Sequence, residues 1–225
     1  MKIIFSCFLM LAALLLQARA QENPKLGFVR IVNAIAHGTG NANFLIDGHD
    51  LFADGYKPGQ TTGGYAVAEG QRMIEVRSGG VIAGKVTVTI ATEETLTLVA
   101  YTERVPTKNP DDIPKWKIIL LKLKQQDNDH GYGLSLVSVA NADETMAKVA
   151  FPGRGKSQSV SLQRCKPTKL DMGRVRDDVV ISVAEKPVTS VSLDAPGVYV
   201  VILFENHDGR PLAISFFDPK FAIAG

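Results

Sequence analysis

The feature that most constrains this chain is a two-residue alternation of apolar and polar side chains, which recurs along most of its length. "RMIEVR" places Ile74 and Val76 on one face, and "KVTVTI" and "VTSVSL" follow the same pattern. Alternation with period two is typical of strands that bury one face. "LTLVAYTE", "WKIILLKLK", "LSLVSVANA", "VYVVILFEN" and "LAISFF" are denser apolar runs and predict central strands. No segment shows a long 3.6-residue stripe, and "NADETMAKVA" fits a short helix or a strand, so the predicted class is all-β.

The chain also repeats itself weakly. "GFVRIVNA" resembles "GLSLVSVANA" with an offset of 108 between Asn33 and Asn141, and a second pair of segments aligns Glu103 with Glu205 at an offset of 102. A period near 100 residues is the size of an immunoglobulin-like domain. We therefore expect two tandem immunoglobulin-like antiparallel β-sandwiches after a signal peptide, at residues 21–124 and 133–225, with a polar linker at 125–132. One continuous larger sandwich is the alternative.

The N-terminus has the pattern of a secretory signal peptide at residues 1–20. Lys2 precedes an uninterrupted apolar run, and "ARA" ending at Ala20 is a small-x-small cleavage motif. The run is shorter than the roughly 20 apolar residues of a spanning helix, which makes a retained membrane anchor the less favoured alternative. No second run is long enough, so no membrane span is expected after cleavage. The predicted location is exported: periplasmic, cell-surface or secreted.

Charge and cysteine content narrow the function classes. Cleavage removes Lys2 and Arg19 from the 25 basic residues, and the 23 that stay equal the 23 acidic ones. A neutral chain gives no reason to expect nucleic acid or an anionic membrane as partner. Only Cys165 follows the signal peptide, so no internal disulfide can form. We expect this thiol to be a small buried hydrophobe, with a reactive thiol as the alternative.

The first part of the chain resembles a known family. "VRIVNA" (Val29–Ala34), "FLIDG" (Phe44–Gly48) and the strand Ala68–Arg77 follow the order and spacing of the bacterial exported family called domain of unknown function 4397. The resemblance covers about residues 26–103, and the second copy follows it in outline only. It implies an exported β-sandwich module of envelope or secreted proteins, and it brings no catalytic residues with it.

The histidines do not form a recognisable metal or catalytic motif. Each of the four lies in a segment with turn-forming residues: His37, His49, His130 and His207. None belongs to an H-x-H, H-E-x-x-H or C-x-x-C pattern. Three have an aspartate neighbour, but adjacent residues of an extended chain point to opposite faces. We expect solvated turn histidines and no cofactor, with a weak metal site of two converging histidines as the alternative.

Two further patterns fall short of a catalytic or calcium site. Asp127 and Asp129 resemble the start of a calcium loop, but Gly131 stands where a ligand is required and Ser138 where the last acid belongs. A calcium ion in the linker stays an open alternative. No G-x-S-x-G nucleophile motif is present. The chain is therefore predicted not to be an enzyme, with a hydrolase of unrecognised site as the least favoured reading.

A basic segment is the one candidate contact surface that the sequence offers. Seven cations and one acid lie between Arg154 and Arg176, and this asymmetry suits a polyanion. The alternative is a solvated face that Asp177 and Asp178 compensate. The seven candidate contact residues are Arg154, Lys156, Arg164, Lys166, Lys169, Arg174 and Arg176.

The expected function is that of a non-catalytic exported protein, an envelope-associated binding or scaffold module. Loops held by a rigid sandwich, or exposed edge strands, would make the contact. The partner would be an unidentified protein or glycan of the cell envelope. A carbohydrate- or polyanion-binding module is the alternative. Trp116, the only tryptophan, lies in an apolar strand and is expected in the core more than as a platform for sugars.

Overall fold

The structure is a computed structural model, and it describes residues 25–107, 109, 111–126, 131–174 and 176–219. It is all-β, as predicted: these residues form sixteen strands and one 3-10 turn, η1 (Pro152–Arg154), with no α-helix among them. The expected signal peptide at residues 1–20 lies outside the described part. Within that part, no helix has the length and apolarity needed to cross a membrane.

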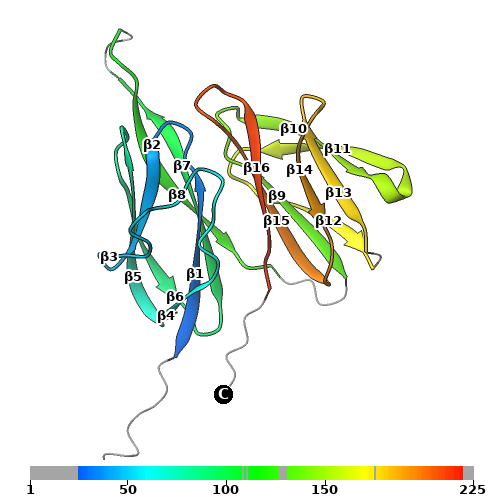
Figure 1. Cartoon of the computed structure of the whole chain (residues 1–225), viewed down its shortest axis with the longest axis horizontal. Coiled ribbons are helices and arrows are strands. Elements are labelled where there is room, and N and C mark those ends of the chain that lie inside the picture. The colour runs from blue at the N-terminus through cyan, green and yellow to red at the C-terminus, as the bar shows by residue number, and fades with distance from the viewer. Residues whose placement is uncertain (1–24, 108, 110, 127–130, 175, 220–225) are drawn as a thin grey trace, which may run out of the picture.

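The strands fall into two halves of eight (Figure 1). The first half contains β1 (Leu26–Ala34), β2 (Thr39–Ile46), β3 (His49–Asp50), β4 (Tyr65–Ala68), β5 (Gly70–Gly79), β6 (Gly84–Ile90), β7 (Thr95–Val105) and β8 (Lys115–Lys124). The second half contains β9 (Tyr132–Ser138), β10 (Glu144–Phe151), β11 (Lys156–Gln163), β12 (Thr168–Gly173), β13 (Asp178–Val183), β14 (Lys186–Ser192), β15 (Gly197–Glu205) and β16 (Pro211–Phe217). The "NADETMAKVA" segment is therefore a strand after a turn.

The two halves have the same sheet topology. In the first half the sheets run β3-β2-β5-β6 and β4-β1-β7-β8. In the second they run β11-β10-β13-β14 and β12-β9-β15-β16, so every strand of the first half has a counterpart eight strands later. The repeat that the sequence shows only faintly is thus complete at the level of strand order.

Three hydrophobic cores separate the four sheets. The first-half core fills the space between the two sheets of that half, with Phe44, Ile74 and Leu98 fully buried. The second-half core does the same around Leu136, Leu162 and Ile181. The inter-half core joins β4-β1-β7-β8 to β12-β9-β15-β16. Its buried members are Val32, Ala34, Val99, Tyr101, Leu123, Val137, Val139, Val198, Val200, Ile202, Phe204 and Ile214.

The inter-half core explains the dense apolar runs. Along β1, Val29 and Ile31 enter the first-half core, while Val32 and Ala34 enter the inter-half core. Both faces of a strand in an inner sheet are covered, so its polar alternation disappears. The expectation that all five dense runs are central strands is wrong for β8 and β16, which are sheet edges. A dense apolar run indicates that both faces of a strand are covered. Both faces of an edge strand are also covered when the strand belongs to an inner sheet.

The prediction of purely antiparallel sandwiches is also wrong in one respect. β1 pairs with β7 in parallel, and β9 pairs with β15 in parallel. A parallel pair needs a crossover, and the intervening strands supply it by visiting the outer sheet. All other strand pairs of the named strands are antiparallel. The sheets are therefore mixed, and each pair of sheets is sandwich-like.

The register of the repeat differs from the predicted offsets of 108 and 102. An offset of 102 would align Ala100 with Ile202, yet Ala100 lies in the first-half core and Ile202 in the inter-half core. A slip of one residue exchanges the two faces of a strand. In the parallel ladders Asn33 pairs with Ala100, 67 positions later, and Ser138 pairs with Leu203, 65 positions later, so the two offsets differ by two and not by six. The offsets predicted from the sequence therefore pair identical residue types that lie on opposite faces of their strands.

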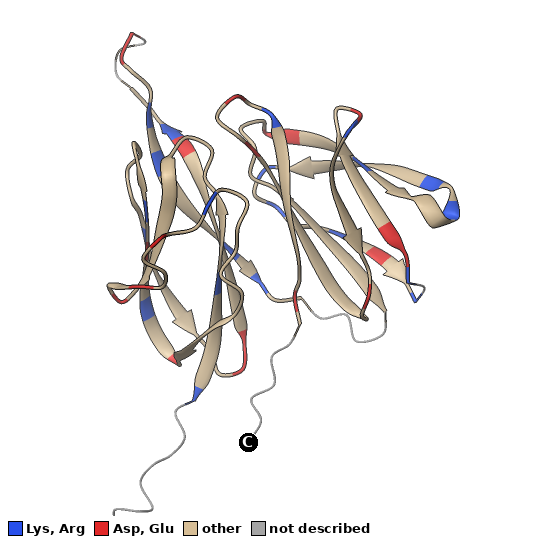
Figure 2. Ribbon diagram, in the orientation of Figure 1, with Lys and Arg blue, Asp and Glu red and all other residues tan. Residues whose placement is uncertain are grey.

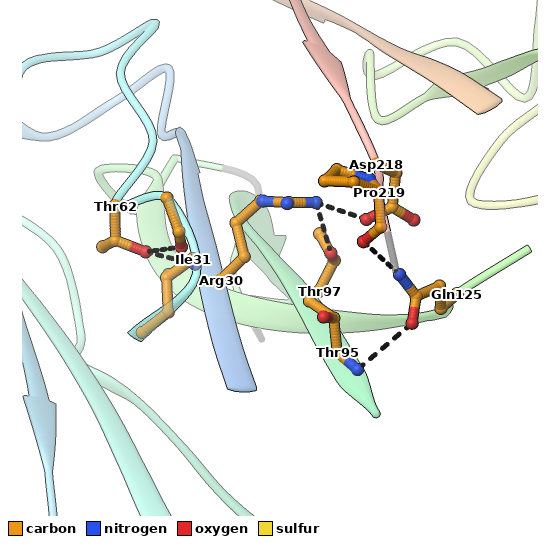
Figure 3. A network of polar contacts seen from close by, with 9 residues as sticks. Arg30, Ile31, Thr62, Thr95, Thr97, Gln125, Asp218 and Pro219 are labelled. Atoms are coloured by element: carbon orange, nitrogen blue, oxygen red, sulfur yellow. Dashed lines mark hydrogen bonds and ion pairs between the residues drawn. The ribbon is translucent and has the colours of Figure 1, made fainter. Parts of the chain in front are cut away.

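A buried ion pair ties the end of the chain to the first half (Figure 3). Arg30, on the inter-half face of β1, donates from Nη1 to Oδ1 of Asp218 over 2.6 Å, and the side chains are 3% and 5% exposed. The guanidinium also lies 4.6 Å from the ring centroid of Phe216. Gln125 donates to the carbonyl oxygen of Pro219 over 2.7 Å. Polar groups near the ends of β8 and β16 thus reach across the inter-half core.

The stretch around His49 is a two-residue β-hairpin. Ile46 pairs with His49, and the two residues between them, Asp47 and Gly48, have φ of 50° and 83°. Positive φ at both central positions is the hairpin turn that an Asp-Gly pair favours. The side chain of Asp47 also accepts a hydrogen bond from the backbone N–H of Met73 over 2.8 Å. The predicted chain reversal is confirmed, and His49 lies exposed just after it.

Replacing Gly48 with valine should lower the free energy of unfolding by about 1–2 kcal/mol, because a β-branched residue tolerates positive φ poorly. A Cβ at Gly48 meets nothing within 4 Å, so backbone strain is the whole cost. His49→Ala is the matched control and should change stability by less than about 0.5 kcal/mol. Urea unfolding of both variants measures the difference. Equal midpoints would contradict the turn assignment.

Candidate binding cleft

The best candidate for a functional site is an open cleft at the junction of the two halves. It has a volume of about 360 Å³, and its lining residues are Glu103, Arg104, Trp116, Asn141 and Arg164. The first three come from paired strands of the first half, with Glu103 and Arg104 on β7 and Trp116 on β8. The other two come from turns of the second half, after β9 and after β11. Ligand sites commonly form where two such units meet.

Trp116 is held by an aromatic stack. The ring centroids of His37 and Trp116 are 3.3 Å apart with an interplanar angle of 10°. His37 Nδ1 lies 3.1 Å from the hydroxyl of Thr102, which fixes the imidazole in turn. Trp116 is half-buried on the sheet face that carries Ile118 into the first-half core, but it belongs to none of the three cores and is among the residues that line the cleft, so the expectation of a core tryptophan is met only in part. β8 is an edge strand, and its first residues extend past the region where both faces are covered.

An ion pair that spans the halves lies on the other face of the sheet from Trp116, because Glu103 adjoins Arg104 in β7 and Arg104 is the ladder partner of Trp116. Arg164 Nη1 lies 3.0 Å from Glu103 Oε1, and Arg164 Nε donates to the carbonyl oxygen of Ala140 over 2.7 Å. The hydroxyl of Tyr101 donates to the same Glu103 oxygen over 2.9 Å. Burial, and then the contacts with Cys165 and Glu103, raise the pKa of Tyr101, so it stays a proton donor. Glu103 and Arg164 are therefore fixed before any ligand arrives.

Cys165 is half-buried beside this ion pair. Its Sγ donates to the Tyr101 hydroxyl over 3.4 Å, and the residue packs against the inter-half core. Its backbone has φ of 60° in the turn that follows β11. The expectation of a buried small hydrophobe is met in part, since the thiol is partly covered and has a polar neighbour.

Asn141 forms the rim of the cleft on the second half. Its backbone N–H and its side-chain Nδ2 both donate to Glu205 Oε2, over 3.2 and 3.0 Å. These bonds join the turn after β9 to the end of β15. The turn is thereby held in place, and the side-chain oxygen of Asn141 has no hydrogen bond from the part of the chain that the structure covers.

Burial lowers the pKa of His37; Glu205 opposes the shift and His207 adds to it. The folded state therefore binds this proton less readily than the unfolded chain, and the free energy of unfolding must fall as the pH drops below about 6.5 toward the folded value. Urea midpoints across this range should fall less steeply in His37→Gln than in the natural protein. An identical pH dependence of the two would contradict the assignment. His49→Gln serves as the exposed control.

The other histidines lie apart from this stack. His49 is exposed on β3, His207 is exposed after β15, and His130 lies outside the described residues. His207 Nε2 is 2.9 Å from Oδ1 of Asp208, so the expectation that neighbours point apart is wrong for this pair. The segment is a turn and not an extended strand. Among the described residues, no group of three His, Cys, Asp or Glu side chains is placed to hold a metal ion. Asp127 and Asp129, the calcium candidates, lie outside them.

The basic segment divides between the two ends of β11. Arg154 and Lys156 lie at its start and Arg164 and Lys166 after its end, about 25 Å apart for an extended strand of this length. Arg154 Nε is 2.7 Å from a carboxylate oxygen of Asp177. This ion pair agrees with the alternative in which Asp177 compensates the charge of the basic segment. One short anion therefore cannot touch both groups.

The other three candidates follow β12. Lys169 is exposed on that strand, and Arg174 and Arg176 follow its last residue, Gly173. Arg176 forms an ion pair with Asp194. Figure 2 shows the basic segments of the second half spread along its strands and turns. Of the seven candidates, only Arg164 lines the cleft.

Sequence reasoning did not single out the cleft residues as a group. Glu103 and Asn141 served only as markers of the repeat, and Arg104 carried no signal. Their side chains meet because turns of the second half approach strand ends of the first, which no local pattern encodes. Two signals were available: Arg164, one of the seven candidate cations, and Trp116, a lone aromatic between two lysines at the start of a strand.

Comparison with known proteins leaves the fold and the cleft as the basis for interpretation, because the chain matches no family model and no curated protein.

Proposed function

We propose that this chain is a non-catalytic exported protein that binds a component of the cell envelope through the cleft between its two halves. The cleft carries the proposal, because residues of both halves line it, among them one aromatic residue, three charged residues and one amide. Its volume of about 360 Å³ falls within the roughly 300–1,000 Å³ of small-ligand sites. Loops on a rigid sandwich are the usual place for such contacts.

The rigidity of the cleft supports binding over a merely structural role. The inter-half core and the Arg30–Asp218 pair hold the two halves against each other. The His37 stack and the Arg164–Glu103 pair hold the lining side chains. A site that is ordered before binding loses less conformational entropy when a ligand enters. The alternative, a glycan or polyanion ligand, is compatible with the same cleft.

The module assignment belongs to the same proposal. The two halves correspond to immunoglobulin-like modules at residues 21–124 and 133–225, joined by 125–132, and related to the exported family called domain of unknown function 4397. The repeated strand order supports the first part. The second part is supported by the quoted residues, which fall on β1, the Asp47–Gly48 turn and β5. N-terminal sequencing of the exported protein should give Gln21 as its first residue.

The test of the binding proposal uses Trp116. The natural protein and Trp116→Ala are compared on a glycan array and in capture experiments with envelope extract. We expect Trp116→Ala to lose at least tenfold in ligand affinity or captured material, because it removes the only aromatic residue of the cleft lining. Tyr65→Ala is the control, since Tyr65 is an aromatic residue 47% exposed outside the cleft. Equal binding by both variants and the natural protein would overturn the proposal.

A further inference from the structure

We propose that β11 is a docking edge for an extended segment of a partner protein that is acidic at both ends and pairs with β11 as an added strand. β11 lies at the end of its sheet and does not line the cleft, so this contact is independent of the proposed function (Figure 1). Three observations carry the inference: the backbone groups that β11 leaves open, the lack of the usual protection of a sheet edge, and the cations at its two ends.

A hydrogen bond just beyond β11 shows which of its backbone groups are open. The N–H of Arg164 donates to the carbonyl oxygen of Asp143 over 2.8 Å, and these two residues continue the β10–β11 register. Bonded and non-bonded pairs alternate in an antiparallel ladder, so the backbone groups of Ser157, Ser159 and Ser161 point away from β10. Within the part of the chain that the structure describes, no other strand pairs with them. β11 therefore presents three N–H and three C=O groups along about 13 Å.

This edge lacks the features that usually prevent a strand from pairing with another chain. Those features are a very short strand, charged side chains, proline or a β-bulge. β11 has eight residues, its register with β10 contains no shift, and neither a charged residue nor proline lies between Ser157 and Gln163. All of its residues except Val160 and Leu162 are exposed. An edge of this length without such protection is suited to strand addition.

The first half covers the corresponding edge. β3 has the place in its outer sheet that β11 has in the second half, but it contains only two residues. The chain then returns to β2, where Ala42 and Tyr56 exchange backbone hydrogen bonds of 2.9 and 2.8 Å. At the other edges of the outer sheets, β6 adjoins β8 and β14 adjoins β16. Among the described strands, β11 is thus the outer-sheet edge that stays open, up to the bridge between Arg164 and Ser138 after its end.

The charges at the two ends of β11 indicate the chemistry of the partner. From Arg154 to Lys166 the chain holds four cations and no acid. Arg154 and Arg164 have carboxylate partners within the molecule. Lys156 and Lys166 are exposed, one at each end, and neither forms an ion pair with a described residue. An extended segment with an acidic group at each end can reach both lysines, and complementary charge also fixes the register of pairing.

The same charges disfavour a second copy of this chain as the partner. Antiparallel pairing of two β11 strands would bring the cations at the start of one strand beside those after the end of the other. Like charges in such contact are destabilising. The side chains of β11 indicate a further property of the partner. Val160 and Leu162 belong to the margin of the second-half core, and the serines lie on the opposite face. A strand beside them should therefore alternate apolar and polar residues.

The experiment measures the binding of two fluorescein-labelled peptides, EETVTVTEE and KKTVTVTKK, by fluorescence polarisation. The first has the proposed alternation and acidic ends, and the second differs only in the charge of its ends. We expect EETVTVTEE to bind at least about tenfold more tightly than KKTVTVTKK, because only the first complements Lys156 and Lys166. Its affinity should fall as salt is added.

Hydrogen exchange followed by NMR locates the bound peptide. At saturating EETVTVTEE, the backbone amides of Ser157, Ser159 and Ser161 should exchange at least about tenfold more slowly, because each gains a hydrogen bond. The amides of Gln158 and Val160 point toward β10 and should change much less. This alternation along β11 is specific to strand addition.

Variants separate the backbone contribution from that of charge. Ser159→Pro removes one open N–H and keeps the ladder with β10, so it should lower the affinity for EETVTVTEE at least about tenfold. The double variant Lys156→Glu/Lys166→Glu should make KKTVTVTKK the tighter ligand. Lys186→Glu reverses an exposed cation on β14 and should leave the preference unchanged. Circular dichroism of each variant checks that the fold is retained, and the charge variants decide the outcome if Ser159→Pro does not fold.

The contrary outcomes are distinct. Absence of EETVTVTEE binding, equal affinity for the two peptides, or unchanged exchange at the three serine amides would each overturn the inference. If a folded Ser159→Pro keeps the full affinity, the lysines alone hold the peptide and β11 is not a docking edge. If the serine amides become protected without peptide as the protein concentration rises, the occupant is a second copy and the inference fails as well.

Discussion

Replacing Asp218 with alanine should lower the free energy of unfolding by about 3–5 kcal/mol, because it leaves the charge of Arg30 buried without its partner. Arg30 is 3% exposed, and Asp218 Oδ1 lies 2.6 Å from it. Its second polar neighbour, the hydroxyl of Thr97, is 3.5 Å away and cannot replace a carboxylate. Urea unfolding followed by Trp116 fluorescence and by circular dichroism measures the loss.

The matched control is Asp208→Ala. Asp208 also lies in an ion pair, with His207, but the side chains are 48% and 74% exposed, and such pairs contribute little. Burial raises the pKa of Asp218, while Arg30 opposes the shift, so placing the carboxylate in the interior itself costs free energy. The apolar double variant Arg30→Met/Asp218→Leu should therefore regain most of what Asp218→Ala loses. Equal losses in the two aspartate variants would refute the role of the buried pair.

The sequence predicts the strands well because their signal is local. Ile74 and Val76 of β5 and Val88 and Ile90 of β6 are buried as the alternation indicates, with the threonines of β6 exposed. The Asp47–Gly48 turn is equally local, since its geometry depends on two residues. What the sequence does not reveal is the packing of the two halves against each other. Dense runs such as β7 indicate that both faces of the strand are covered, but they do not indicate which elements cover them.

Arg30 illustrates the same limit for polar residues. It interrupts an apolar strand, and no local rule states that its partner lies 188 positions away. The cleft depends on this long-range packing as well, since Asn141 and Arg164 approach the ends of β7 and β8 only because the inner sheets meet. The prediction of a contact surface from charge alone selected seven cations, and the structure brings one of them into the cleft. Spacing along the chain cannot show which cations already have partners.

The second large effect should come from Ile202→Ala, which removes a fully buried side chain from the inter-half core. Deleting this much buried hydrocarbon costs about 2–5 kcal/mol. Ile202 belongs to β15 of the second half, whereas Trp116 belongs to the first. Both inner sheets lose contacts when this core is weakened. The substitution should therefore destabilise both halves, and the two halves should unfold in one transition. The fluorescence of Trp116 should then shift to lower urea by the same amount as the circular dichroism signal.

Ile113→Ala is the control for this comparison, since Ile113 is 84% exposed and its removal should leave both midpoints unchanged. A decisive contrary result would be a circular dichroism transition that splits in two while the Trp116 midpoint stays in place. That result would show that each half is stable without the inter-half core. A single shifted transition would instead mean that the cleft persists only while both halves are folded, because its two walls belong to different halves and the inter-half core lies beneath them.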